Sequence, residues 1–186
     1  MIRDRLIQRF EAWHPIVQFV DAHVDEWFEP LRGRPAIDTV AYFASELADF
    51  SVGWHLLNGG VALVRPDLEH KALHMALTLG VESALVNGAI KPLFDRPRPD
   101  GWEQVSSLTV RRPKTASFPS GHASSGAVAA VLLSDAVPEL KIVWWTLAGV
   151  VAGSRIYTRM HHASDVAAGA VVGTAIGLVA QRLTSK

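Results

Sequence analysis

Three glycines at four-residue spacing, Gly169, Gly173 and Gly177, lie in the uncharged centre of the segment DVAAGAVVGTAIGLVAQRL near the C-terminus. Glycine is costly in a water-exposed helix, so a helix that repeats it needs a partner packed closely against it. Repeated small residues at this spacing are typical of helix contacts inside membranes. The pattern therefore predicts a closely packed helix from Asp165 to about Leu183.

Four further helical segments rich in apolar residues precede this one. They are predicted at Asp38–Val64, at Ala72–Ile90, at Ser120–Ala136, and from Pro138 to about Ser154. None offers about 20 uniformly apolar residues, but the charges cluster near the segment ends, and no stretch alternates as a strand does. We therefore predict an all-α helical membrane bundle with about five transmembrane helices. A soluble bundle is the alternative, because the mean hydropathy of +0.18 lies between the two classes.

Residues 2 to about 31 form a predicted amphipathic helix that Pro15 can kink. Aromatic residues such as Trp13 and Trp27 suit a membrane interface, and the stretch LRGRP ends the helix at Pro35. The start of the chain lacks the continuous apolar core of a secretory signal. We expect one domain over residues 1–186, with an interfacial N-terminal helix over 1–35 and the chemistry within 91–165.

Composition excludes several classes of site. The chain has no cysteine, which rules out disulfides, thiolate metal ligands and a cysteine nucleophile. Its 18 basic residues balance 18 acidic ones, so no overall field favours nucleic acid.

Polar residues gather in three clusters between the apolar segments. Lys91 and Arg98 open a proline-rich loop, the sequence PSGH ending at His122 closes it, and SRIYTRMHHASD separates the last two helices. If the helices alternate in direction, all three clusters lie at the same end of the bundle. Long loops in compact domains are often functional, so this end is the predicted site.

The residue types in these clusters indicate phosphoryl transfer. Guanidinium and ammonium groups offset the charge on phosphate oxygens, and a helix N-terminus binds anions through its backbone N–H groups. His161 and Asp165 share one helix face, so that the carboxylate can hold one ring nitrogen and leave the other nucleophilic. A second histidine can protonate the leaving oxygen and later activate water. The residues assigned are His161, His122 and Asp165 for catalysis, and Lys91, Arg98, Ser120, Gly121 and Arg155 for phosphate binding.

The three clusters together resemble the type 2 phosphatidic acid phosphatase superfamily, and its bacterial membrane lipid phosphatase branch in particular. The family pattern is K-x6-RP, then PSGH, then SR-x5-H-x3-D, and this chain carries KPLFDRPRP, PSGH and SRIYTRMHHASD in that order. The resemblance implies that His161 is the nucleophile, that Asp165 orients it and that His122 is the acid and base. It also implies a phosphohistidine intermediate and no metal or other cofactor.

The resemblance implies a lipid phosphate as substrate, in contact with the bilayer. Phosphatidic acid, phosphatidylglycerol phosphate, a polyprenyl pyrophosphate and a polyprenyl-linked sugar phosphate all fit. The alternatives are a soluble or periplasmic class A-like acid phosphatase and a vanadate-dependent peroxidase. We expect an integral protein of a bacterial plasma membrane and leave its oligomeric state open. The count of basic residues favours a cytoplasmic active face, whereas the habit of the family favours an outward one.

Several polar residues of the same region receive weaker interpretations. His162 is expected to make local hydrogen bonds, because it points about 100° away from His161 on a helix. A metal site built from these two histidines and Asp165 is disfavoured for the same reason. The remaining loop cations either meet an anionic headgroup or are solvated: Arg96, Arg111, Arg112 and Lys114.

Overall fold

The computed structural model describes residues 2–101, 113 and 115–184, with side chains from Pro15 onward. These residues form helices and connecting turns, with no strand among them, so the predicted all-α fold is confirmed. The α-helices are α1 (Ile2–Phe28), α2 (Pro35–Leu47), α3 (Val52–Val64), α4 (Glu69–Ser83), α5 (Gly121–Ala136), α6 (Lys141–Tyr157) and α7 (Ala163–Thr184).

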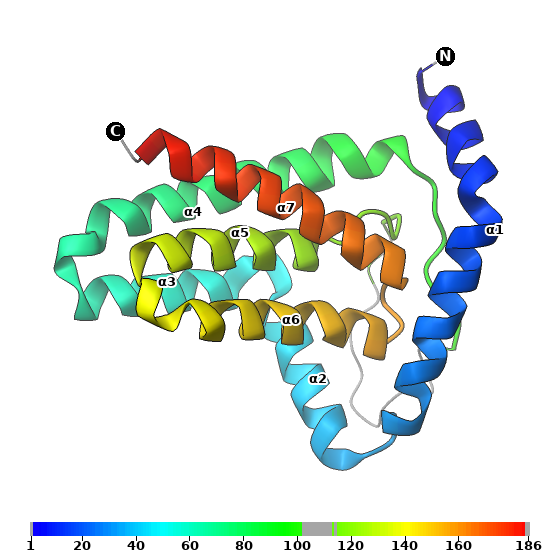
Figure 1. The fold of residues 1–186 in the computed structure, drawn as a ribbon, viewed down its shortest axis with the longest axis horizontal. Helices are drawn as coiled ribbons and strands as arrows, with labels where there is room; N and C mark the ends of the chain where they lie inside the picture. The colour runs from blue at the N-terminus through cyan, green and yellow to red at the C-terminus, as the bar shows by residue number, and fades with distance from the viewer. Residues whose placement is uncertain (1, 102–112, 114, 185–186) are drawn as a thin grey trace.

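Helix α5 is the centre of the bundle, and α4, α6 and α7 pack around it (Figure 1). Every residue from Ala123 to Leu133 is buried, which explains why this helix is built from small apolar side chains. The glycines of α7 face it at very short range. A Cβ at Gly169 would lie 2.2 Å from the carbonyl oxygen of Ser120, and one at Gly173 would lie 2.0 Å from that of Ser124. The close packing expected from the glycine spacing is present.

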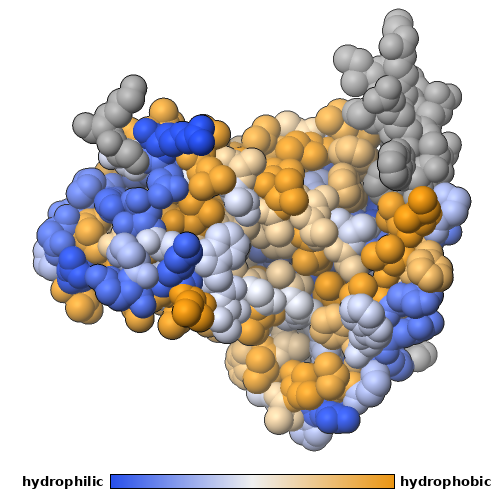
Figure 2. Space-filling view, in the orientation of Figure 1, coloured by the Kyte–Doolittle hydropathy of each residue, from blue (hydrophilic) through white to orange (hydrophobic). Residues whose placement is uncertain are grey.

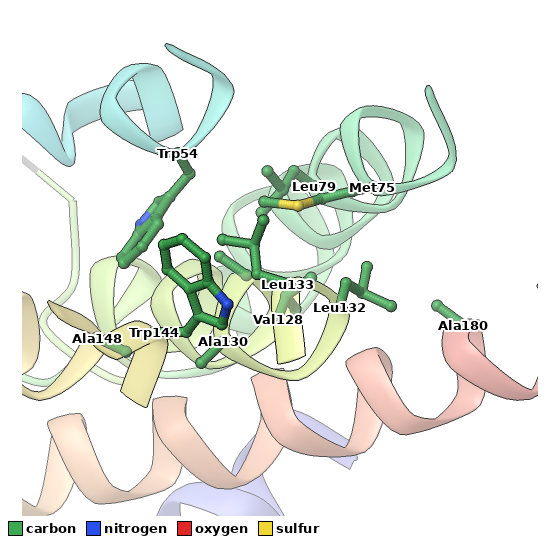
Figure 3. Packing of buried hydrophobic residues seen from close by; sticks show 11 residues of the cluster. Trp54, Met75, Leu79, Val128, Ala130, Leu132, Leu133, Trp144, Ala148 and Ala180 are labelled. Carbon is green, nitrogen blue, oxygen red and sulfur yellow. The ribbon is translucent and has the colours of Figure 1, made fainter. Parts of the chain in front are cut away.

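The apolar core lies between α3, α4, α5 and α6 (Figure 3). Two buried tryptophans belong to it, Trp54 from α3 and Trp144 from α6. Met75 and Leu79 of α4 pack against Leu133 of α5 on the other side. This core holds α3, α4, α5 and α6 together.

On the face that Figure 2 shows, the middle of the bundle is strongly apolar, whereas hydrophilic residues gather toward the α3–α4 end and again on the side of α1. Leu63, Ile142 and Val171 are more than two-thirds exposed on three different helices, as expected for side chains in contact with lipid. By length and composition alone, two described stretches qualify as membrane spans, Pro66–Leu93 and Ala163–Thr184.

The segment predicted as one helix over Asp38–Val64 is two helices, and this part of the prediction is wrong. Helix α2 ends at Leu47 and α3 begins at Val52, each with 13 residues. Between them Phe50 and Ser51 adopt left-handed backbone angles, with φ of 51° and 59°. Neither is a glycine, so the chain pays for this turn with strain. The break sits at the motif end of the bundle.

Helix α1 continues past Pro15 to Phe28 and crosses the ends of α6 and α7 (Figure 1). One side of it is apolar and open, with Ile16, Phe19 and Trp27 each more than 60% exposed. The other side carries Asp21, which is buried against the α6–α7 connection. The amphipathic character predicted for this segment is present over the described side chains, and Trp13 lies outside them.

Candidate active site

The connection between α6 and α7 folds back on the end of α6. The backbone N–H groups of Met160 and His161 both donate to the carbonyl oxygen of Arg155, each at 3.0 Å. Arg159 takes a left-handed conformation, with φ of 52°, that reverses the chain. These contacts satisfy the open carbonyl end of the helix and hold His161 at the base of the site.

His161 is a buried imidazole with a carboxylate on one side of its ring. Its side chain is 2% exposed, and its Nδ1 lies 3.7 Å from Asp165 Oδ2, slightly beyond hydrogen-bond length. Nε2 points to the other side, where Arg98 Nη1 lies 3.4 Å away. Burial lowers the pKa of His161 to about 3, and the charges of Arg155 and Arg98 act in the same direction. An imidazole that stays unprotonated at neutral pH keeps the lone pair that a nucleophile requires.

Asp165 is held from three sides and is fully buried. Its Oδ2 accepts the backbone N–H of His162 at 2.9 Å, and its Oδ1 pairs with Arg96. Its own carbonyl oxygen accepts the N–H of Ser120 at 3.0 Å, which links the start of α5 to the start of α7. This hydrogen bond joins the PSGH motif directly to the SRIYTRMHHASD motif.

Three buried cations, Arg98, Arg155 and Lys91, gather at this end of the bundle, and the first two act on His161. Arg98, 7% exposed, donates to the carbonyl oxygen of Met160 at 2.6 Å. Arg155, 1% exposed, pairs with Ser45 Oγ through Nη1, and its Nε has no hydrogen-bond partner. Lys91 is 8% exposed and interacts electrostatically with both arginines. Like charges buried together are costly without a counter-charge, so this group is suited to an anion.

The start of α5 supplies the remaining predicted residues. Ser120 caps the helix by accepting the N–H of Ala123 through its Oγ at 3.4 Å, so its hydroxyl has a structural partner as well as its predicted role. A Cβ at Gly121 would lie 3.3 Å from Asn87 Oδ1, which favours the smallest residue at this position. His122 turns toward the α2–α3 break, and its Nε2 lies 2.9 Å from Asp49 Oδ1.

The structure thus brings all eight predicted site residues to one end of the bundle. It also adds residues that the motifs do not contain. Arg96, interpreted from sequence as a headgroup or solvent contact, is instead nearly buried between Asp21 and Asp165. Arg111, Arg112 and Lys114 lie outside the described residues.

His162 makes a local contact, as expected, with its Nε2 at 3.3 Å from the carbonyl oxygen of Pro97. Burial lowers its pKa below the usual value for histidine. Among the described residues no group of three or more histidine, aspartate or glutamate side chains is placed to hold a metal ion.

A membrane helix bundle that closes one end around a neutral histidine, its carboxylate and a set of buried cations has the construction of a lipid-phosphate-handling enzyme. Residues 71–186 match the PAP2 superfamily, and the chain belongs to this family. The membership expected from the three motifs is confirmed.

Curated relatives in mycobacteria share much of the chain. The decaprenylphosphoryl-5-phosphoribose phosphatase of Mycobacterium tuberculosis is 32% identical over 152 residues, covering 80% of this chain and 81% of the relative. The protein of that name from Mycolicibacterium smegmatis is 34% identical over 144 residues, covering 75% and 74%.

Two solved structures share the fold. A transmembrane PAP2 type phosphatidylglycerolphosphate phosphatase from Bacillus subtilis superposes with a TM-score of 0.72 at 23% identity, over 98% of this chain and 96% of its own. Aquifex aeolicus LpxE superposes with a TM-score of 0.60 at 22% identity, over 90% and 93%. These likenesses confirm the all-helical fold predicted from sequence, and the two described apolar stretches are consistent with a place in a membrane.

Proposed function

We propose that this chain is an integral membrane phosphatase that hydrolyses a phosphate ester or pyrophosphate of a lipid without a metal ion. The observation that carries the proposal is the buried His161, which has the Asp165 carboxylate on its Nδ1 side and Arg98 beside Nε2. An in-line attack on phosphorus requires such a nitrogen, with cations around the three oxygens that do not leave.

The proposed reaction has two steps. In the first, Nε2 of His161 forms a bond to phosphorus, the bond from phosphorus to the lipid oxygen breaks, and protonated His122 gives its proton to that oxygen. In the second, His122, now neutral, takes a proton from water as the water oxygen attacks phosphorus and the N–P bond breaks. Inorganic phosphate leaves, and both histidines return to their starting states. Asp165 stabilises the positive charge that His161 carries while it is phosphorylated.

An apolar groove beside these residues is suited to the lipid tail. A cavity of about 240 Å³ lies between α2, α3 and α6, and its lining contains no charged residue: Ala44, Leu47, Ala48, Gly53, Trp54, Leu57, Leu147, Val150 and Val151. It borders the site directly, because Val151 is one turn before Arg155 and Ala48 precedes Asp49. Leu47 and Leu147 are also exposed on the outer surface, where a bilayer lipid can enter. We propose that the first part of the substrate's tail occupies this groove.

The substrate class follows from the relatives. Decaprenylphosphoryl-5-phosphoribose phosphatases match most of this chain at 32–34% identity, whereas the phosphatidylglycerolphosphate phosphatase matches at 23%. We therefore propose a polyprenyl-linked sugar phosphate ahead of a glycerolipid phosphate or a pyrophosphate.

We also propose that the active end faces the cytoplasm. Helix α1 lies at this end. Counted from the sequence, the basic residues of the first 35 residues and of the loop after Lys91 outnumber those assigned to the other side, which are Arg65, Lys71, Lys141, Arg182 and Lys186. A surplus of basic residues in short segments marks the cytoplasmic side.

Phosphate release by the detergent-purified protein tests the function. The panel contains a polyprenyl-linked sugar phosphate, phosphatidylglycerol phosphate, a polyprenyl pyrophosphate and a water-soluble phosphomonoester, each with EDTA present. We expect release from lipid substrates that persists in EDTA and disappears in His161→Ala. His55→Ala, which removes an exposed histidine of α3, is the matched control and should retain activity. Activity that survives His161→Ala, or that EDTA abolishes and a metal restores, would overturn the proposal.

A further inference from the structure

The break between α2 and α3 has no explanation in helix propensity. Neither proline nor glycine occurs at positions 48–51, and two consecutive residues with side chains, Phe50 and Ser51, take left-handed angles. Left-handed backbone angles are unfavourable for residues that carry a Cβ. Phe50 is also 90% exposed, so burial of its ring does not offset that cost. Strain of this kind is most often kept where it places a functional group.

The group that the break places is Asp49. It begins the strained turn, and its Oδ1 lies 2.9 Å from Nε2 of His122. The distance is that of an ion pair, although the atoms are not aligned as in an ideal hydrogen bond. His122 is 15% exposed and starts the first turn of α5, so its ring is held between α5 and this turn. A continuous helix over Asp38–Val64 would not present the carboxylate in this position.

The surroundings of His122 are otherwise positive. The charged groups that act on it are Arg155 from α6, Lys91 from the short helical turn Lys91–Leu93, and Asp49 from the break. Two cations oppose the protonated imidazole that the first chemical step requires, and one carboxylate favours it. Asp49 also interacts electrostatically with Arg155. Among the described groups that act on His122, Asp49 is the one that favours its protonated form.

Resting on the proposed function, we propose that Asp49 is a positioning residue for the general acid. It holds the Nε2–H of His122, so that the other ring nitrogen faces the leaving oxygen, and it stabilises the imidazolium before that proton is given up. The N–H bond at the second nitrogen breaks as the O–H bond of the leaving alcohol forms, and Nε2 keeps its proton throughout. The arrangement is a second carboxylate–histidine pair, in addition to that of Asp165 and His161.

Comparing esters with different leaving groups distinguishes a positioning role of Asp49 from a merely structural one. A lipid alkoxide needs a proton as it leaves, whereas p-nitrophenolate does not. In Asp49→Asn we expect kcat/KM, which reports phosphorylation of the enzyme, to fall by about 10- to 100-fold for an alkyl or lipid phosphate and by less than about threefold for p-nitrophenyl phosphate. The alkaline limb of the profile for the alkyl ester should move to lower pH.

Two further variants make the result unambiguous. Asp49→Glu keeps the charge and should restore part of the alkyl-ester activity, which also covers the case in which the asparagine variant folds poorly. Asp67→Asn removes an exposed carboxylate at the opposite end of the bundle and should change neither ester. Equal losses on both esters, or no loss on either, would overturn the inference while leaving the proposed function standing. If the unaltered protein releases no phosphate from either ester, the proposed function fails first, and the inference fails with it.

Discussion

Asp21 and Asp165, on the first and the last helix of the bundle, bind the two terminal nitrogens of one guanidinium, that of Arg96. Arg96 Nη2 lies 2.5 Å from Asp21 Oδ2, and its Nη1 pairs with Asp165 Oδ1. Asp21 in turn accepts the N–H and the hydroxyl of Ser164, each at 2.8 Å. Helix α1 is thereby linked through Arg96 to Asp165, the carboxylate beside His161.

This relationship predicts that Arg96 controls catalysis without touching phosphate. Arg96→Lys removes one of the two directed contacts, because an ammonium group cannot replace a planar fork that reaches two partners. We expect kcat to fall by about tenfold or more with KM nearly unchanged, since Asp165 loses its fixed position. Steady-state kinetics on the purified variant measure this. Arg65→Lys, an exposed pair with Asp67 at the far end, is the control. A rise in KM alone would mean that Arg96 binds substrate instead.

The buried state of His161 predicts the acid side of the pH profile. The nucleophile must be neutral, and its lowered pKa means that it gains a proton only well below the ordinary histidine value of about 6.5. The acid limb of kcat/KM that belongs to the enzyme should therefore lie below that value. The measurement is kcat/KM against pH, with the separate titration of the substrate phosphate followed by NMR. An enzyme limb at the ordinary histidine value would contradict the neutral, buried nucleophile.

The groove predicts a separation between lipid and soluble substrates. Val150→Trp fills the cavity from α6 and should raise KM for a long-chain lipid phosphate by about tenfold, since two displaced methylene groups account for roughly 1.6 kcal/mol. Activity toward a water-soluble ester should not change. Val143→Trp adds the same bulk on α6 at an exposed position that does not line the cavity. If both variants behave alike toward the lipid, the tail lies elsewhere.

The contact between α5 and α7 predicts a steep dependence on side-chain size. Gly173→Ala places a Cβ at 2.0 Å from the carbonyl oxygen of Ser124, so the helices must move apart, at a cost of about 1–3 kcal/mol. We expect a lower unfolding temperature in detergent. Gly149→Ala on α6 meets nothing within 4 Å and should be neutral or slightly stabilising, because alanine is the better helix former. An unchanged unfolding temperature for Gly173→Ala would mean that the helices lie further apart than described.

The absence of cysteine from the chain makes its orientation directly measurable. Single cysteines at Arg34, near the active end, and at Asp67, on the α3–α4 turn, are both exposed positions. If the active end is cytoplasmic, a membrane-impermeant thiol reagent added to intact cells should label the cysteine at 67 and not the one at 34. The reverse pattern would place catalysis outside the cytoplasmic compartment. Labelling after permeabilisation shows that both sites react.

The sequence predicts the helical class, the close glycine packing and the gathering of the motifs because each depends on local chemistry or on helix direction. The break at Asp49–Ser51 could not be predicted, since Phe50 and Ser51 are ordinary helix residues by propensity and the contact of this turn, Asp49 with His122, joins residues far apart in the chain. Arg96 was misinterpreted for a related reason. Its partner Asp21 belongs to a helix far away in the chain, and no spacing rule connects the two.

The missing side chains of Gly169 and Gly173 have a consequence beyond packing. They let α7 come so near to α5 that the N–H of Ser120 reaches the carbonyl of Asp165. His122 belongs to α5, and Asp165, the carboxylate beside His161, belongs to α7. The distance between His122 and His161 is therefore set in part by the close glycine contact between α5 and α7. A methyl group added at Gly169 or Gly173 would push the two helices apart. It would therefore slow the reaction without altering any residue of the site.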